Sequence, residues 1–228
     1  MKMKIGILLS GCGVYDGAEI QEAVLSMLAI EELGAEYICI GINANQHHVI
    51  NHLSGEEMPE ERNMMIEAAR ISRGEIVDIK SIQPVDIDAL VIPGGFGSAK
   101  NLTKWAFNGA DGAIMPEVKL LLVNLIKVGK PIAALCVSPI LLAKALENSS
   151  IKSTLTVGTT FEKSPYDIQS FSTEISKTGA IHTLKTVREI EIDIENKIIS
   201  APCYMMNASI LEVKKNITSA IQALINLA

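Results

Sequence analysis

The chain has 228 residues, 48% of them hydrophobic, which is enough to bury the core of one large α/β domain; we expect a single domain over residues 1–228. It carries 20 Lys and Arg against 26 Asp and Glu, a net charge of -6, and its basic residues are scattered. This charge pattern argues against partners such as nucleic acid or an anionic membrane surface.

Short runs rich in β-branched residues alternate with amphipathic stretches, which is typical of a layered α/β domain with a mostly parallel sheet. In chain order, the expected elements are a strand at 4–10, a helix at 18–33, a strand at 36–42, a helix at 60–72, a short strand near 76, a strand at 89–92, helices at 99–107 and 116–128, a strand at 131–135, a helix at 139–146, a strand at 155–157, a helix at 165–178, a hairpin of 189–194 and 197–200, and a closing helix at 207–227. No internal repeat or linker interrupts this pattern.

The N-terminal apolar run is short. Ile5 to Leu9 is less than the roughly 7 to 15 residues of a secretory signal or the about 20 residues of a membrane-spanning helix. We therefore expect a cytoplasmic protein. The four cysteines have irregular spacing and no C-x-x-C pair, so they do not suggest a disulfide framework.

Cys136 ends the expected strand at 131–135, and a helix begins at once with Pro139 in its first turn. The small residues Ala134 and Ser138, two before and two after the thiol, fit the sharp turn of a nucleophile elbow. The start of the following helix would favour a thiolate, and the Val137 amide would face an oxyanion. The same spacing also fits an inert cysteine buried at a strand end.

A second turn, Pro93-Gly94-Gly95-Phe96-Gly97, follows the strand at 89–92. Paired glycines let backbone amides approach a ligand, and parallel strands open their turns at one sheet edge. Gly95 is therefore a candidate oxyanion donor, although glycines also occur in simple tight turns.

Glu22 lies near the start of the helix at 18–33. It shares one side of the predicted helix with Ala18, Leu25 and Ala29, which are small or apolar, so the carboxyl can point into a cleft. The carboxylate can equally complement the dipole at the start of the helix. On the same helix Ile20, Val24, Met27 and Leu28 form an apolar face. The preceding turn has glycines spaced G-x-G-x-x-x-G, which is not the dinucleotide-binding pattern, and no Walker A motif exists. We expect no cofactor.

Residues 43–59 lack a clear period and hold three of the four histidines, so we expect a functional or interface loop. His48 and His52 are four residues apart, but the glutamate of a zinc-binding helix is missing and no third ligand is evident. We therefore predict no metal site. Cys39 and Cys203 are interpreted as structural.

Several segments together resemble the ElbB (enhancing lycopene biosynthesis) family, a branch of the ThiJ/PfpI, class I glutamine amidotransferase-like superfamily. They are Leu8-Leu9-Ser10-Gly11-Cys12-Gly13-Val14-Tyr15-Asp16-Gly17, Val49-Ile50-Asn51-His52-Leu53, Arg62 with Glu67-Ala68-Ala69-Arg70-Ile71, Arg73-Gly74-Glu75-Ile76, and 93–101.

The resemblance implies a flavodoxin-like three-layer sandwich, with a mostly parallel central sheet and a C-terminal hairpin plus helix, and a homodimer. It implies a reactive thiol at Cys136, a glutamate hydrogen-bonded to it at Glu22, and an oxyanion amide at Gly95. Many superfamily members carry histidine after the cysteine, where this chain has Val137. Whether His52 or His182 assists Cys136 stays open.

The resemblance further implies a glutathione-independent glyoxalase that converts small 2-oxoaldehydes such as glyoxal to hydroxy acids such as glycolate, an activity that can reflect deglycation. The alternative is a redox or metabolite sensor with an oxidisable Cys136, linked to isoprenoid metabolism. An amidotransferase subunit is a third reading, which the absent histidine disfavours.

Overall fold

Uniformly apolar strands form the centre of the molecule. The structure is a computed structural model that describes residues 2–228. Its strands are β1 (Lys4–Leu8), β2 (Glu36–Gly41), β3 (Ile76–Asp78), β4 (Ala89–Ile92), β5 (Ile132–Leu135), β6 (Thr154–Leu155), β7 (Ile181–His182), β8 (Glu191–Asp193) and β9 (Ile198–Ala201). Its α-helices are α1 (Ile20–Glu32), α2 (Met64–Ile71), α3 (Trp105–Asn108), α4 (Pro116–Lys127), α5 (Pro139–Leu146), α6 (Ile168–Lys177) and α7 (Ile210–Leu227).

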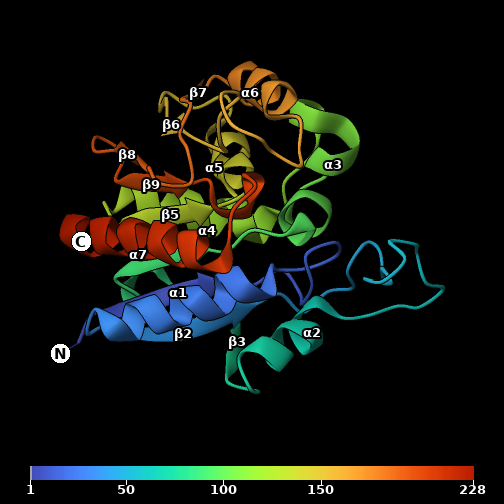
Figure 1. Cartoon of the computed structure of the whole chain (residues 1–228). Helices are drawn as coiled ribbons and strands as arrows, with labels where there is room; N and C mark the ends of the chain where they lie inside the picture. The colour runs from blue at the N-terminus through green and yellow to red at the C-terminus, as the bar shows by residue number, and fades with distance from the viewer. Residues whose placement is uncertain (1) are drawn as a thin grey trace.

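Seven strands form the main sheet in the order β3-β2-β1-β4-β5-β9-β8. All neighbours run parallel except β8, which pairs antiparallel with β9 as the expected hairpin. Strands β4, β5 and β9 are buried along their whole length, because helices cover both faces of the sheet. Helices α1 and α7 lie side by side on one face, and α4 and α5 pack on the other (Figure 1). The predicted flavodoxin-like three-layer sandwich is confirmed.

The expected apolar face of the first helix does not meet the core. Ile20, Val24 and Leu28 are 44 to 47% exposed, and of the four only Met27 is buried. The helix instead buries small residues such as Ala23 and Ala29. Helix α1 packs closely against the sheet and α7 and also buries Ile30 and Met27, whereas Ile20, Val24 and Leu28 lie on its outer surface.

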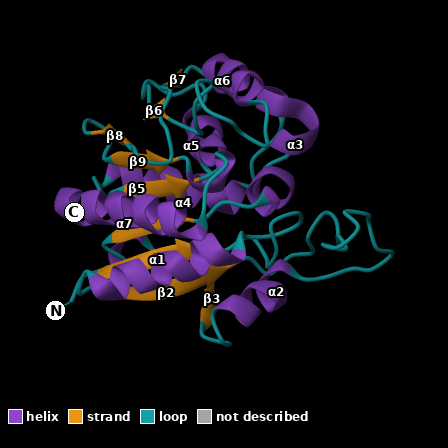
Figure 2. Cartoon of the chain, viewed as in Figure 1, coloured by secondary structure: helices purple, strands orange, loops and turns teal. Residues whose placement is uncertain are grey.

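Other differences from the sequence prediction have local causes. The second helix begins at Met64 rather than residue 60, because the Asn63 side chain caps it by accepting hydrogen bonds from two backbone amides. Residues 99–107 form a π-helical turn (Ser98–Leu102) followed by the one-turn helix α3. The strand expected at 155–157 is β6, which lies outside the main sheet and pairs with the unpredicted β7 (Figure 2).

The chain reverses its direction of strand addition between β1 and β4. Strands β2 and β3 extend the sheet on one side of β1, and β4, β5 and β9 extend it on the other. A crevice opens at the carboxyl ends of the strands at such a point, and α/β proteins bind ligands there. The turns after β1, β4, β5 and β9 all reach this edge of the sheet.

Candidate functional site

Cys136 occupies a strained turn between β5 and α5. Its φ of 58° lies in the left-handed region, which costs a non-glycine residue roughly 1 to 3 kcal/mol, and its amide donates to the Ala201 carbonyl at 2.8 Å. Behind the turn, the Ser138 hydroxyl donates to the Pro93 carbonyl at 2.6 Å and lies 2.8 Å from the Ser98 hydroxyl. These bonds tie the turn to the loop after β4, and the local geometry is that of a nucleophile elbow.

The Glu22 carboxyl is fully buried against Cys136. One carboxyl oxygen, Oε2, accepts a hydrogen bond from the Gly94 amide at 2.8 Å, and the other, Oε1, accepts one from the Tyr204 amide at 3.3 Å. The carboxyl also shares a hydrogen bond with the Cys136 thiol. Burial, and then the neighbouring Glu19 carboxylate, raise the pKa of Glu22 to about 8. The carboxyl is therefore mostly neutral at pH 7.

Burial also raises the pKa of the Cys136 thiol well above its ordinary range, with a smaller contribution from the Glu22 carboxylate. The Val137 amide opposes this shift by hydrogen bonding to the sulfur. Burial therefore opposes the thiolate that the sequence predicts at this helix start. Because the pKa of the thiol lies above that of Glu22, loss of the first proton from this pair leaves a Glu22 carboxylate beside a neutral thiol.

Two glycines allow these groups to meet. A Cβ on Gly94 would lie 2.3 Å from the Cys136 Cβ and 2.6 Å from Oε2 of Glu22, so no larger residue fits. Gly95 has a φ of 97°, and a Cβ there would lie 2.3 Å from the Gly17 carbonyl oxygen. Within residues 2–228 the Gly95 amide has no hydrogen-bond acceptor, and it borders the thiol. The four predicted site residues, Cys136, Glu22, Gly95 and Val137, thus meet at one point.

A narrow pocket leads to the thiol, which is 5% exposed. Its walls are mostly apolar and aromatic: Val14, Glu19, Gly95, Phe96, Cys136, Val137, Tyr166, Phe171, Tyr204 and Met205. Glu19, Tyr166 and Tyr204 are not among the site residues predicted from the sequence. Glu19 also caps α1 by accepting a hydrogen bond from the Glu22 amide at 2.6 Å. Burial raises the pKa of Tyr166 to about 12, so its phenol stays protonated. Of these three residues, only Glu19 has a recognisable sequence signal, which is an acidic residue just before a helix.

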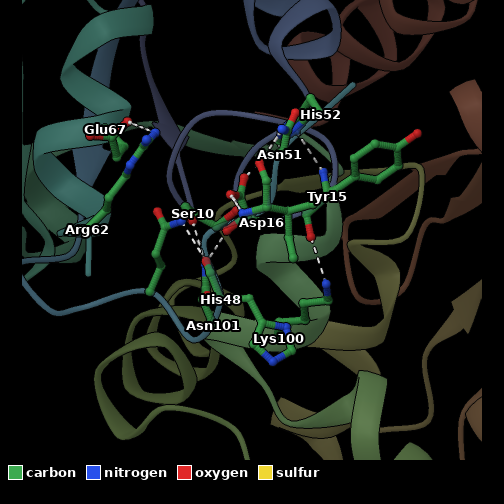
Figure 3. A network of polar contacts seen from close by, with 12 residues as sticks. Ser10, Tyr15, Asp16, His48, Asn51, His52, Arg62, Glu67, Lys100 and Asn101 are labelled. Carbon is green, nitrogen blue, oxygen red and sulfur yellow. Dashed lines mark hydrogen bonds and ion pairs between the residues drawn. The ribbon is translucent and has the colours of Figure 1, made fainter. Parts of the chain in front are cut away.

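The loop of residues 43–59 is fastened to the first turn by the polar network in Figure 3. The buried Asn101 side chain donates to the carbonyls of Ser10 and Asp16 at 3.0 and 2.8 Å and accepts from the His47 amide at 2.8 Å. The Asp16 carboxylate accepts a hydrogen bond from the Ile50 amide at 2.7 Å. The loop therefore has a defined position beside the crevice.

The histidines lie apart from the thiol. His52 accepts a hydrogen bond from the Tyr15 amide at 3.3 Å, and His182 accepts one from the Val157 amide at 3.2 Å. Neither borders the pocket at Cys136. In the described part of the chain, no group of three or more His, Cys, Asp or Glu side chains is arranged to hold a metal ion. Within the same residues, 2–228, every helix is too short or too polar to cross a membrane.

The other cysteines differ in position. Cys39 and Cys203 are buried, and Cys12 is half-buried in the first turn. Cys203 is not remote from the site, since it influences the pKa of Cys136 electrostatically and has a φ of 46°.

Comparisons with known proteins identify the family of this chain. No protein-family model matches the sequence. The human protein named glutamine amidotransferase-like class 1 domain-containing protein 3, mitochondrial, is 36% identical over 228 residues, which cover 98% of this chain and 83% of the human protein. The chain belongs to the ES1 family of class I glutamine amidotransferase-like proteins. The name of the human member refers to mitochondria. For this chain, a cytoplasmic location stays a prediction.

A solved structure extends the ES1 assignment. The crystal structure of an isoprenoid biosynthesis protein with an amidotransferase-like domain from Ehrlichia chaffeensis is 34% identical and covers 99% of this chain and 100% of that one, with a TM-score of 0.88. It confirms the resemblance to the isoprenoid-linked ElbB branch. Glyoxalase III from Candida albicans shares the fold at 13% identity, with 97% of both chains covered and a TM-score of 0.60.

Proposed function

We propose that this protein is a Cys136-dependent, glutathione-independent glyoxalase acting on small 2-oxoaldehydes such as glyoxal. The observation that carries the proposal is the contact between the Cys136 thiol and the buried Glu22 carboxyl at the end of a narrow apolar pocket. A nucleophile paired with a group of strongly shifted pKa is the arrangement that covalent catalysis needs. The scaffold shared with a fungal glyoxalase III is compatible with this chemistry.

The first step is addition of the Cys136 sulfur to one aldehyde carbon in molecules whose Glu22 is ionised, with the thiol proton passing to the Glu22 carboxylate or to a water that it positions. The resulting alkoxide accepts hydrogen bonds from the amides of Gly95 and Val137. Glu22 returns the thiol proton to the alkoxide oxygen and is again a carboxylate. It then takes the proton from the carbon bound to sulfur and delivers it to the neighbouring carbonyl carbon. The hydroxyl proton moves to the oxygen of that carbonyl, and a hydroxyacyl thioester forms. Water hydrolyses the thioester to glycolate and regenerates the thiol, so one glyoxal and one water give one glycolate and one proton.

The raised pKa of Glu22 suits this role. A carboxyl that titrates near pH 8 exchanges protons readily at neutral pH, whereas an ordinary glutamate stays ionised. The apolar walls keep bulk water away from the intermediate until the thioester forms. Hydrolysis of a glycated thiol or amine would begin with the same addition, so deglycation belongs to the same proposal.

Glyoxal turnover by Cys136→Ala protein tests the proposal. We expect loss of glycolate formation by at least about 1,000-fold, as measured by proton NMR of substrate and product, because the covalent step has no substitute. Cys12→Ala is the matched control, since it removes a more exposed thiol outside the pocket. Full activity in Cys136→Ala, or equal loss in Cys12→Ala, would overturn the mechanism.

A redox or metabolite sensor is the second candidate. The observation that favours it is the neutral Glu22 carboxyl beside the sulfur, because a protonated carboxyl can donate a hydrogen bond to a sulfinate. Treatment with hydrogen peroxide followed by intact-protein mass spectrometry distinguishes the two. Rapid gain of two oxygen atoms at Cys136 without glyoxal turnover supports the sensor and contradicts the enzyme.

A further inference from the structure

A second, larger pocket opens beside the thiol pocket. It is open to solvent and is lined by Tyr15, Ile50, Gly55, Phe96, Lys100, Pro165 and Tyr166. Phe96 and Tyr166 also line the thiol pocket, and their rings pack edge to face with centroids 5.8 Å apart. The two aromatic side chains therefore line both pockets, at the boundary where the pocket at Cys136 meets this outer pocket.

Lys100 sets the charge of the outer pocket. Among the described residues that line it, Lys100 is the only one with an ionised side chain. Its ammonium donates to the Tyr15 carbonyl at 2.9 Å (Figure 3). It also lies 5.5 Å from the centroid of the Phe96 ring. Lysine has three N–H donors, and the Tyr15 carbonyl accepts one, so donors remain for a ligand.

The charges around Lys100 leave it able to bind an anion. Asp16 and Glu57 both act on it and raise its pKa, whereas burial lowers its pKa by a larger amount. The Asp16 carboxylate is buried and accepts from the Ile50 amide, and the exposed Glu57 carboxylate lies 3.9 Å from the His48 ring. Neither carboxylate forms an ion pair with Lys100 in the described chain.

The loop of residues 43–59 builds this pocket. Ile50 and Gly55 of the loop face Pro165 and Tyr166, which precede α6. The Asp16 and Asn101 hydrogen bonds hold the loop in place, and they join it to the same turn as Tyr15. The apolar part of the pocket, from Ile50, Pro165 and Tyr15, suits the carbon chain of a ligand whose anionic end meets Lys100.

Glyoxal is too small to use this space. We propose that the substrates of this site are 2-oxoaldehydes that carry a carboxylate or phosphate a few bonds from the aldehyde, with Lys100 binding the anion in the outer pocket while the aldehyde enters the pocket at Cys136. This inference rests on the proposed glyoxalase function. The shared chemistry is an anionic oxygen group; which of the two anions binds better is decided by experiment.

The test compares kcat/KM for three probes. They are 4,5-dioxopentanoate, its neutral methyl ester, and 3-phosphooxy-2-oxopropanal. We expect wild-type protein to prefer each anion over the ester by about tenfold or more, because charge-assisted hydrogen bonds are strong. Lys100→Met should remove the preference by lowering kcat/KM for both anions toward that for the ester, and Lys100→Arg should keep it. Lys104→Met is the matched control, since Lys104 lies four residues on and outside the pocket.

Direct binding separates this inference from the proposed function. 4-Oxopentanoate lacks the aldehyde, and its affinity for wild-type and Lys100→Met protein can be measured by titration calorimetry. Turnover of the ester with no preference for either anion refutes the anion pocket and leaves the glyoxalase standing. Absence of all turnover, together with Lys100-dependent binding of 4-oxopentanoate, refutes the glyoxalase and supports the anion pocket. Equal effects of Lys100→Met and Lys104→Met refute the assignment to Lys100.

Discussion

The buried carboxyl of Glu22 makes the stability of the protein depend on pH in an unusual direction. Its pKa is about 8 in the folded chain and about 4.5 when unfolded, so the folded state binds more protons between these values. The stabilisation from the neutral carboxyl is complete below pH 4.5 and is lost as pH rises through about 8. Each pH unit in that window lowers the free energy of unfolding by about 1.4 kcal/mol, to a total of about 5 kcal/mol.

Glu22→Gln isolates this titration. Glutamine keeps the shape of the neutral acid, but only one of its terminal atoms accepts hydrogen bonds, while the amides of Gly94 and Tyr204 both donate. We expect a constant loss of about 1 to 3 kcal/mol for the unsatisfied donor and no contribution to the pH slope. The wild-type advantage over the variant is therefore greatest near pH 5 and shrinks or reverses by pH 8.

Urea unfolding followed by circular dichroism at pH 5, 6, 7 and 8 measures the difference in free energy of unfolding between wild type and Glu22→Gln. The contributions of all other titrating groups cancel in this difference. Glu31→Gln is the control, since Glu31 is an exposed acid on the same helix. We expect it to follow the wild-type slope. A difference between wild type and Glu22→Gln that stays constant with pH, or grows as pH rises, would refute the neutral buried carboxyl.

Two further predictions follow from packing. Gly94→Ala should lose about 1 to 3 kcal/mol of unfolding free energy and most glyoxal turnover, because its Cβ would displace Cys136 or the Glu22 carboxyl; unchanged thermal unfolding and unchanged turnover would contradict this. In the predicted homodimer, we expect the second copy to pack on the half-exposed apolar face of α1. Val24→Glu should therefore give monomers in size-exclusion chromatography with light scattering. Val128→Glu, which changes an exposed valine after α4, should leave the dimer intact. A dimer in Val24→Glu would place the interface elsewhere.

Hydrophobic runs and turn residues determined much of the fold. Strand β4 and helix α5 have their predicted bounds, because Pro93-Gly94 and Pro139 are strong local signals. The elbow at Cys136 is equally local, since a strand, a small-residue turn and a helix follow one another within a few residues. The proximity of Cys136 and Gly95 follows from the predicted parallel sheet, because parallel strands bring the turns at their carboxyl ends to one edge.

Contacts between distant residues decided the rest. The orientation of α1 depends on α7 and on which side chains are short enough to pack beneath it, and helical periodicity does not contain that information. The pairing of β6 with β7 depends on two residues in each strand, too few for a pattern. Likewise, the ionisation of Glu22 is determined by burial and by the Tyr204 amide, which is 182 residues away in sequence. A sequence places chemical groups along a chain, whereas desolvation, which sets the pKa values and the reactivity here, arises only when the chain closes around them.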